Sequence, residues 1–263
     1  MKSVYFLMII ALFATTLGGC NKFKSDHPQS EIADQQATDL TSKTILEYTK
    51  LIDKNIPKLS KETSLVYMLG ETSFYVERYL ENEKTILLVE HVYNGGVTNS
   101  LKKYYFKNDS LILEKSESKV ANDDGTIFKD SRTFIRNNTI FKVDGRTASS
   151  EGAIQTLAFI DVPLSQNKTA DQTILENAKS LTDILEGKER FSMVFESITT
   201  YPDSRYIILS NKTENSYTAS ILVKQRDQFI DSLLTDPGLF KNQKLNIKWV
   251  VQDHEAIYLP AVQ

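Results

Sequence analysis

Polar turn clusters recur at short intervals in the first half of the chain, and their spacing constrains the fold more than any other feature. They lie at Glu81-Asn82-Glu83-Lys84, Asn94-Gly95-Gly96, Lys107-Asn108-Asp109-Ser110, Asn122-Asp123-Asp124-Gly125, Asn137-Asn138 and Asp144-Gly145. The segments between them are dense in Val, Ile, Leu, Phe, Tyr and Thr, which favour strands. Because a parallel crossover needs a dozen or more residues, such short connections allow only antiparallel pairing. The pattern predicts a meander of six or seven strands.

The second strand of this meander is apolar on both faces, since Leu88 and Val92 alternate with Leu87 and Val89. A strand of this kind is expected at the centre of a sheet that is covered on both sides. An amphipathic helix that ends before Gly187 supplies a cover for one face; its apolar positions are Ile174, Leu175, Ala178, Leu181, Ile184 and Leu185. A shorter helix is predicted over Ser42 to Lys54. Ala153 to Val162 fits either a strand or a helix, and a helix that starts after Ser149-Ser150 is favoured.

After Gly187 the pattern restarts as a shorter unit. Strand patterns over 190–199, 205–210 and 217–224 are followed by a helix over 225–234 and by two strands over 244–252 and 256–259. In element order and length alone, this unit resembles the OB-fold, a small Greek-key barrel. The alternative is a generic α+β cap on the first domain. The expected fold class is α+β and β-rich: an antiparallel meander packed with helices over 42–187, then a small OB-like barrel over 188–263.

The first twenty residues have the order of a bacterial export signal. Met1-Lys2 is a short positive region, and an apolar run from Val4 to Leu17 is shorter than the roughly 20 residues of a membrane span. The run ends in Leu17-Gly18-Gly19-Cys20, which resembles the lipobox of bacterial lipoproteins. The resemblance implies a signal peptide over 1–19, cleavage after Gly19, and acylation of Cys20, palmitate included, so that the chain is held on a membrane. The alternative is an ordinary secreted protein in which Cys20 is a free thiol.

Residues 20–41 are predicted to be a flexible tether, because Asn21 to Leu40 is polar and aperiodic. A coil of this length has a root-mean-square reach of roughly 25 Å. In the lipoprotein family the residue after the cysteine influences sorting, and Asn21 favours the outer membrane. The expected location is therefore the bacterial cell envelope, with the folded part in the periplasm and anchored to the bilayer through Cys20.

Charge and cysteine content exclude several classes of function. The formal net charge is −3, which is too mild for an electrostatic nucleic-acid binder. Cys20 is the only cysteine, so an internal disulfide, a multi-thiolate zinc site and a redox CxxC motif are impossible. Residues 120–131 fail the calcium-loop pattern at both charged anchor positions, and no phosphate-binding glycine loop is present. No cofactor and no metal site are expected.

Catalytic groups are scarce. The three histidines are His27 in the tether, His91 in a strand, and His254 in a turn between Asp253 and Glu255. No Gly-x-Ser-x-Gly elbow is present to expose a serine nucleophile. Three consecutive residues in an extended turn diverge, which argues against a metal site at Asp253, His254 and Glu255. No catalytic residue is therefore assigned.

Tyrosines crowd the predicted meander, at Tyr75, Tyr79, Tyr93, Tyr104 and Tyr105. Tyrosine suits surfaces that are partly apolar and partly wet, but cross-strand packing is the favoured explanation for these residues. The leading hypothesis is a non-enzymatic envelope lipoprotein that binds another envelope protein as an adaptor. A carrier of lipid or another hydrophobic ligand is the first alternative, and an envelope hydrolase is the second. The sequence does not identify the residues that bind the ligand.

Overall fold

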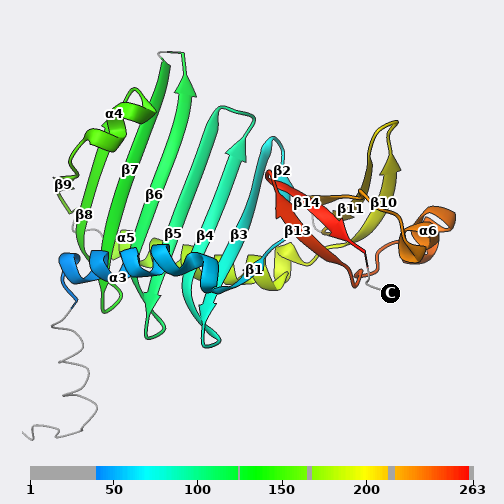
Figure 1. The fold of residues 1–263 in the computed structure, drawn as a ribbon, viewed down its shortest axis with the longest axis horizontal. Helices are drawn as coiled ribbons and strands as arrows, with labels where there is room; N and C mark the ends of the chain where they lie inside the picture. The colour runs from blue at the N-terminus through cyan, green and yellow to red at the C-terminus, as the bar shows by residue number, and fades with distance from the viewer. Residues whose placement is uncertain (1–39, 124, 165–167, 213–216, 261–263) are drawn as a thin grey trace, which may run out of the picture. The chain divides into compact units, whose positions relative to one another are not determined.

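The computed structural model describes residues 40–123, 125–164, 168–212 and 217–260, which belong to one compact unit that begins at Leu40 (Figure 1). Its α-helices are α3 (Ser42–Asn55), α4 (Glu151–Thr156), α5 (Lys168–Glu186) and α6 (Gln228–Thr235), and its short 3-10 helices are η1 (Ile56–Lys58), η2 (Glu189–Phe191) and η3 (Pro237–Phe240). Its strands are β1 (Ser60–Thr63), β2 (Tyr67–Leu69), β3 (Thr72–Glu81), β4 (Lys84–Asn94), β5 (Thr98–Lys107), β6 (Ser110–Asn122), β7 (Gly125–Arg136), β8 (Thr139–Ala148), β9 (Ile160–Val162), β10 (Val194–Thr200), β11 (Arg205–Ser210), β12 (Thr218–Leu222), β13 (Lys248–Gln252) and β14 (Glu255–Leu259).

The predicted meander is confirmed. Strands β3 to β9 lie side by side in chain order, and each pairs antiparallel with the next. They form one part of a 14-stranded sheet that is antiparallel except where β12 pairs with β14. The β-rich, mostly antiparallel class expected from the turn spacing is therefore correct.

Two-residue turns join β3 to β4, β5 to β6, and β7 to β8. The central residues of the β3–β4, β5–β6 and β7–β8 turns all have positive φ, as at Asn82 (50°), Glu83 (64°), Asn108 (50°) and Asp109 (62°). Positive φ at both central positions matches the right-handed twist of hairpin strands, and asparagine tolerates it better than most residues. This is why the asparagine-containing clusters in the sequence mark the ends of strands.

The prediction of a turn at Asp144-Gly145 is wrong, because both residues lie inside β8 and pair with Arg132 and Ser131 of β7. A glycine fits this strand position because a Cβ there would lie 3.2 Å from the Asp130 carbonyl oxygen.

Two helices cover opposite faces of the meander, as Figure 1 shows for α3 and α5. Ile45 and Ile52 of α3 belong to one core with Leu87, Tyr105 and Phe134 of the sheet. The helix α5 packs in a second core, which contains Leu181 and Ile184 from the helix and Leu88, Tyr104 and Ile135 from the sheet. The double apolar pattern of β4 is thereby explained, since neighbouring residues of a strand point to opposite faces. We call these the α3 face and the α5 face.

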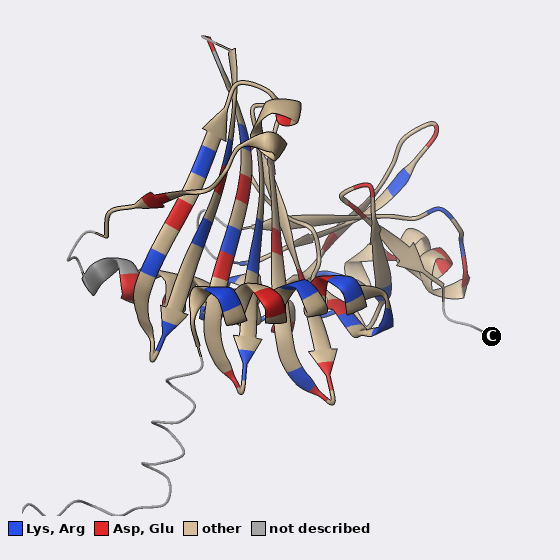
Figure 2. Ribbon diagram, turned by 60° about the vertical axis from the view of Figure 1, so that its left-hand side comes forward, with Lys and Arg blue, Asp and Glu red and all other residues tan. Residues whose placement is uncertain are grey.

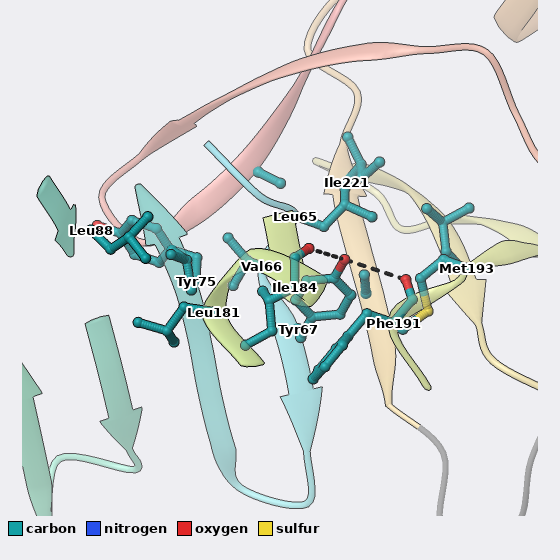
Figure 3. Close-up of a cluster of buried hydrophobic side chains, with 14 of the residues drawn as sticks. Leu65, Val66, Tyr67, Tyr75, Leu88, Leu181, Ile184, Phe191, Met193 and Ile221 are labelled. Atoms are coloured by element: carbon teal, nitrogen blue, oxygen red, sulfur yellow. Dashed lines mark hydrogen bonds between the residues drawn. The ribbon is translucent and has the colours of Figure 1, made fainter. Parts of the chain in front are cut away.

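Tyr67 connects the meander to the C-terminal part of the chain. Its ring is buried in the larger core, next to Phe191 at a centroid distance of 5.3 Å (Figure 3). Its hydroxyl lies 3.2 Å from the Ile184 carbonyl oxygen and 3.4 Å from that of Phe191, and burial raises the pKa of Tyr67 well above its usual range. The hydroxyl therefore ties the end of α5 to η2, where the Ile184 carbonyl also accepts from the Gly187 amide.

The C-terminal part has the expected order of three strands, a helix and two strands, β10, β11, β12, α6, β13 and β14. These strands are continuous with the meander, because β12 pairs with β2 and β2 pairs with β3. Among the described residues, β10 and β13 form no ladder with each other, so closure into a small barrel stays a prediction.

Candidate binding groove

A groove of about 600 Å³ lies on the α3 face of the meander, on the part of the strands that α3 does not cover. Its floor is built from every second residue of β4 to β8: Tyr93, Asn99, Leu101, Glu117, Lys119, Phe128, Asp130 and Arg146. One wall is α4, through Glu151, Ile154 and Gln155, and His254 of the β13–β14 turn closes the other side. The floor is a flat sheet surface, and the walls come from segments distant in sequence.

Charged side chains cross the α3 face in rows, because directly paired residues of neighbouring strands share a face. Lys103, Lys115 and Arg132 are paired in succession across β5, β6 and β7, and Figure 2 shows the alternating charges along the long strands. Like charges directly opposite each other are destabilising. Asp53 of α3 compensates this row, since its carboxylate lies 3.5 Å from Lys103 Nζ and 3.1 Å from Lys115 Nζ.

Burial alone would raise the pKa of Asp53. The ammonium groups of Lys115 and Lys103 and a hydrogen bond from the Tyr105 hydroxyl (2.8 Å) outweigh the burial, and the pKa lies below its ordinary value. Asp53 therefore stays ionised, and it holds α3 on the sheet next to the groove.

The next row, on the groove floor, contains Glu117 opposite Asp130 and Asp130 opposite Arg146. Arg146 donates to Asp130 through Nε at 2.8 Å and lies within hydrogen-bond distance of the Leu157 carbonyl oxygen at 3.0 Å. Glu117 is exposed, and no hydrogen bond or ion pair joins its carboxylate to another described residue. In the like-charged pair of Glu117 and Asp130, the Glu117 carboxylate is therefore available at the groove surface.

The wall formed by α4 is held by a stacked aromatic ring. The Phe159 ring lies 3.6 Å from the Arg132 guanidinium carbon and 4.5 Å from that of Arg146. Cation–π contacts of this kind stabilise by about 0.5–2 kcal/mol each. Both guanidinium groups also pair with carboxylates on the sheet, those of Asp144 and Asp130. Phe159 therefore fixes the loop after α4 against the sheet.

The opposite wall brings together two predicted histidines. His91 stacks on Tyr75 with a centroid distance of 4.2 Å, and His254 lies 3.7 Å from the Tyr93 ring. Burial, and the nearby His91, lower the pKa of His254. His254 is therefore neutral at pH 7 and packs as an aromatic ring.

Glu77 lies beneath this histidine wall. Its carboxylate accepts from the Tyr79 hydroxyl at 2.9 Å and from Lys61 Nζ at 3.0 Å, and it lies 3.4 Å from His91 Nε2. Burial would raise the pKa of Glu77, but hydrogen bonds from His91, Lys61 and Tyr79 lower it to about 2. Glu77 is consequently a fixed anion that anchors the base of the wall.

The sequence-predicted residues fall into three groups. Cys20 and His27 lie outside the described residues. Of the five tyrosines in the meander, Tyr75, Tyr79, Tyr104 and Tyr105 are buried, and Tyr93 lines the groove. Asp253 and Glu255 flank His254 in a tight turn, and the described part of the chain contains no group of three or more His, Cys, Asp or Glu that could hold a metal ion.

Sequence reasoning missed the groove floor, including Glu117, Phe128, Asp130 and Arg146. One sequence signal could have located it. On β6, the positions that face α3 are buried and apolar at the start of the strand but become Lys115, Glu117 and Lys119 toward the β6–β7 turn. That change marks the point at which α3 no longer covers the strands.

In comparisons with known proteins, no protein family, no curated protein and no solved structure matches the chain. In the described residues, no helix is both long enough and apolar enough to cross a membrane.

Proposed function

We propose that this chain is a lipid-anchored protein of the bacterial envelope, and that its folded part binds another envelope protein through the groove on the α3 face. The anchor rests on the resemblance of Leu17-Gly18-Gly19-Cys20 to a lipobox. The binding role rests on the presence of the groove, which the sheet, α4 and the β13–β14 turn form together. No catalytic step is proposed, because the two described histidines are packed on tyrosine rings and not beside a nucleophile.

The composition of the groove favours a polar partner over a hydrophobic ligand. Small apolar ligands are usually held in concave sites that bury most of their surface. This groove is an open sheet surface whose floor presents the free carboxylate of Glu117, the ammonium of Lys119 and the amide of Asn99. Phe128 and Tyr93 add apolar area between these groups. A polar surface with a few aromatic side chains is typical of interfaces between separately folded proteins.

The groove can be tested by photocrosslinking in cells. A photoreactive residue at Asn99 or Lys119 should capture one defined envelope protein, because both side chains line the groove. The same group at Val120 or Ile127 is the matched control, since these exposed residues are neighbours on β6 and β7 that point to the α5 face. Adding Glu117→Lys should reduce the groove crosslink at least tenfold, by placing a cation where the partner meets an anion. Equal capture from both faces, or a crosslink unaffected by Glu117→Lys, would contradict the proposal.

The anchor is tested separately. Cys20→Ala should abolish incorporation of labelled palmitate and should move the protein from the membrane fraction to the soluble fraction, because the acylated thiol is the attachment point. Labelled palmitate on the Cys20→Ala chain would disprove the assignment.

We also propose that β10–β14 with α6 form an OB-like unit. The supporting observations are the strand order β10-β11-β12-β14-β13, with β12 and β14 parallel, and the position of α6 between the third and fourth strands. Backbone hydrogen bonds of 2.8 Å join Phe195 of β10 to Asn242 and Gln243, shortly before β13. This link brings the two outer strands of the unit toward closure.

A further inference from the structure

The outward side of α3 carries a stripe of lysines. Lys43, Lys50 and Lys54 are exposed on the side opposite the buried Ile45, Thr49 and Ile52, and Lys58 of η1 continues the stripe as an exposed residue. With 3.6 residues per turn, the three helical lysines project in nearly the same direction. Figure 2 shows the basic segments along this helix. Glu47 is the only acidic residue in the stripe, and Leu51 is 60% exposed beside it.

These lysines are not compensated by the protein. No carboxylate of the described residues lies within ion-pair distance of Lys43, Lys50, Lys54 or Lys58. The one aspartate of α3, Asp53, is directed at Lys103 and Lys115 on the sheet. The stripe therefore has three net positive charges, four lysines less Glu47, on a chain whose formal net charge is −3.

The position of the lysine stripe in the chain also favours contact with a membrane. The helix α3 begins at Ser42, so it is the first described helix after Cys20. Because 21 residues separate Cys20 from Ser42, α3 stays within reach of a membrane that holds Cys20. An anionic membrane surface repels a chain with net negative charge in most orientations. It attracts this chain at the lysine stripe, where four lysines outnumber the single acidic residue Glu47.

We propose that the outward face of α3 docks on an anionic phospholipid surface, with Lys43, Lys50, Lys54 and Lys58 at the headgroups and Leu51 at the interface. That α3 lies near a membrane rests on the proposed lipid anchor, but the contact between the lysines and the headgroups needs no acyl chain. Docking in this way turns the α3 face toward the bilayer, because α3 and the groove share one face of the sheet. The groove then meets the membrane-proximal part of its partner.

Vesicle binding of the chain from Asn21 onward, which lacks the acylated cysteine, tests this docking. This chain contains the whole compact unit that begins at Leu40 and all the residues of both cores. It should sediment with phosphatidylcholine vesicles that contain 30 mol% phosphatidylglycerol and stay in solution with pure phosphatidylcholine, at about 50 mM salt. Binding should be lost near 0.5 M salt, where the Debye length falls to roughly 4 Å. Each lysine near an anionic surface strengthens binding about fivefold, so changing Lys43, Lys50, Lys54 and Lys58 together to Gln should lower the partition coefficient by roughly 600-fold.

A second quadruple variant controls for net charge. Lys224, Lys241, Lys244 and Lys248 are also exposed and lack ion-pair partners among the described residues, so their change to Gln removes the same charge elsewhere. This control should weaken binding no more than about threefold, and both variants should keep the wild-type melting temperature. Equal loss in the two variants, equal binding to neutral vesicles, or no binding to anionic vesicles would overturn the docking proposal. None of these outcomes bears on acylation of Cys20, which palmitate labelling tests independently.

Discussion

Replacing Asp144 by Ala should destabilise the fold by about 3 kcal/mol, because removing one partner of a buried ion pair leaves the other charge uncompensated. The Asp144 side chain is 4% exposed, and it accepts from Arg132 Nε at 2.6 Å and from a terminal guanidinium nitrogen of Arg132 at 2.8 Å. Arg132 is 20% exposed and cannot move freely into water, since Phe159 lies on its guanidinium plane. Thermal unfolding measures the effect, and a fall of roughly 6–12 °C in Tm is expected for a domain of this size.

Asp161→Ala is the matched control. Asp161 also pairs with a basic residue of β8, at 2.8 Å from Lys142 Nζ, but its side chain is 77% exposed. Exposed pairs contribute about 0–1 kcal/mol, so this variant should melt within a few degrees of wild type. Similar Tm shifts for Asp144→Ala and Asp161→Ala would show that burial of the Arg132–Asp144 pair does not make it more stabilising than an exposed pair.

Acidification should remove about 3 kcal/mol of stability through Glu77 alone. Its pKa in the folded protein is about 2, whereas an unfolded glutamate titrates near 4.3. Because the folded-state pKa is the lower one, the stabilisation is complete above about pH 5 and is lost as the pH falls through 4.3 toward 2. The side chain is 15% exposed, so solvent screens the effect only in part. Urea unfolding at pH 6 and pH 3 should show about 2 kcal/mol of this loss.

Glu77→Gln removes the titrating group and keeps its shape. The variant should be less stable than wild type at pH 6, and its stability should change less between pH 6 and pH 3, by about 2 kcal/mol. Glu196→Gln is the control, since Glu196 is exposed on β10 with no ion-pair partner among the described residues. An equal pH dependence in wild type and Glu77→Gln would rule out the proposed anchoring of the histidine wall by Glu77.

Local patterns predicted the elements well. Five of the six turn clusters located hairpins, because tight turns with positive φ select asparagine, aspartate and glycine whatever the rest of the fold does. The sixth, Asp144-Gly145, lies inside β8. The stripe of Ile45, Thr49 and Ile52 located α3, and Ser150 marked the start of α4 by accepting a hydrogen bond from the Ala153 amide. These features depend on residues within one turn of each other. They can therefore be read without knowledge of distant contacts.

The groove could not be predicted in the same way. His91 and His254 are far apart in sequence and meet only because the β13–β14 turn lies beside β4, where both pack on tyrosine rings. Glu117 is an ordinary polar strand residue until the pairing of β6 with β7 sets it opposite Asp130. Nothing local to either residue encodes these partners.

The neighbours Tyr104 and Tyr105 show where sequence information ends. By itself the sequence determined that both lie in a strand and point to opposite faces, since strand side chains alternate. Only the tertiary structure decided their partners. The Tyr105 hydroxyl faces α3 and donates to Asp53 at 2.8 Å, whereas the Tyr104 hydroxyl is buried on the α5 face with no hydrogen-bond partner among the described residues. The physical reason is that alternation is fixed by backbone geometry within a strand, while the partner of a side chain depends on which helix returns to which face.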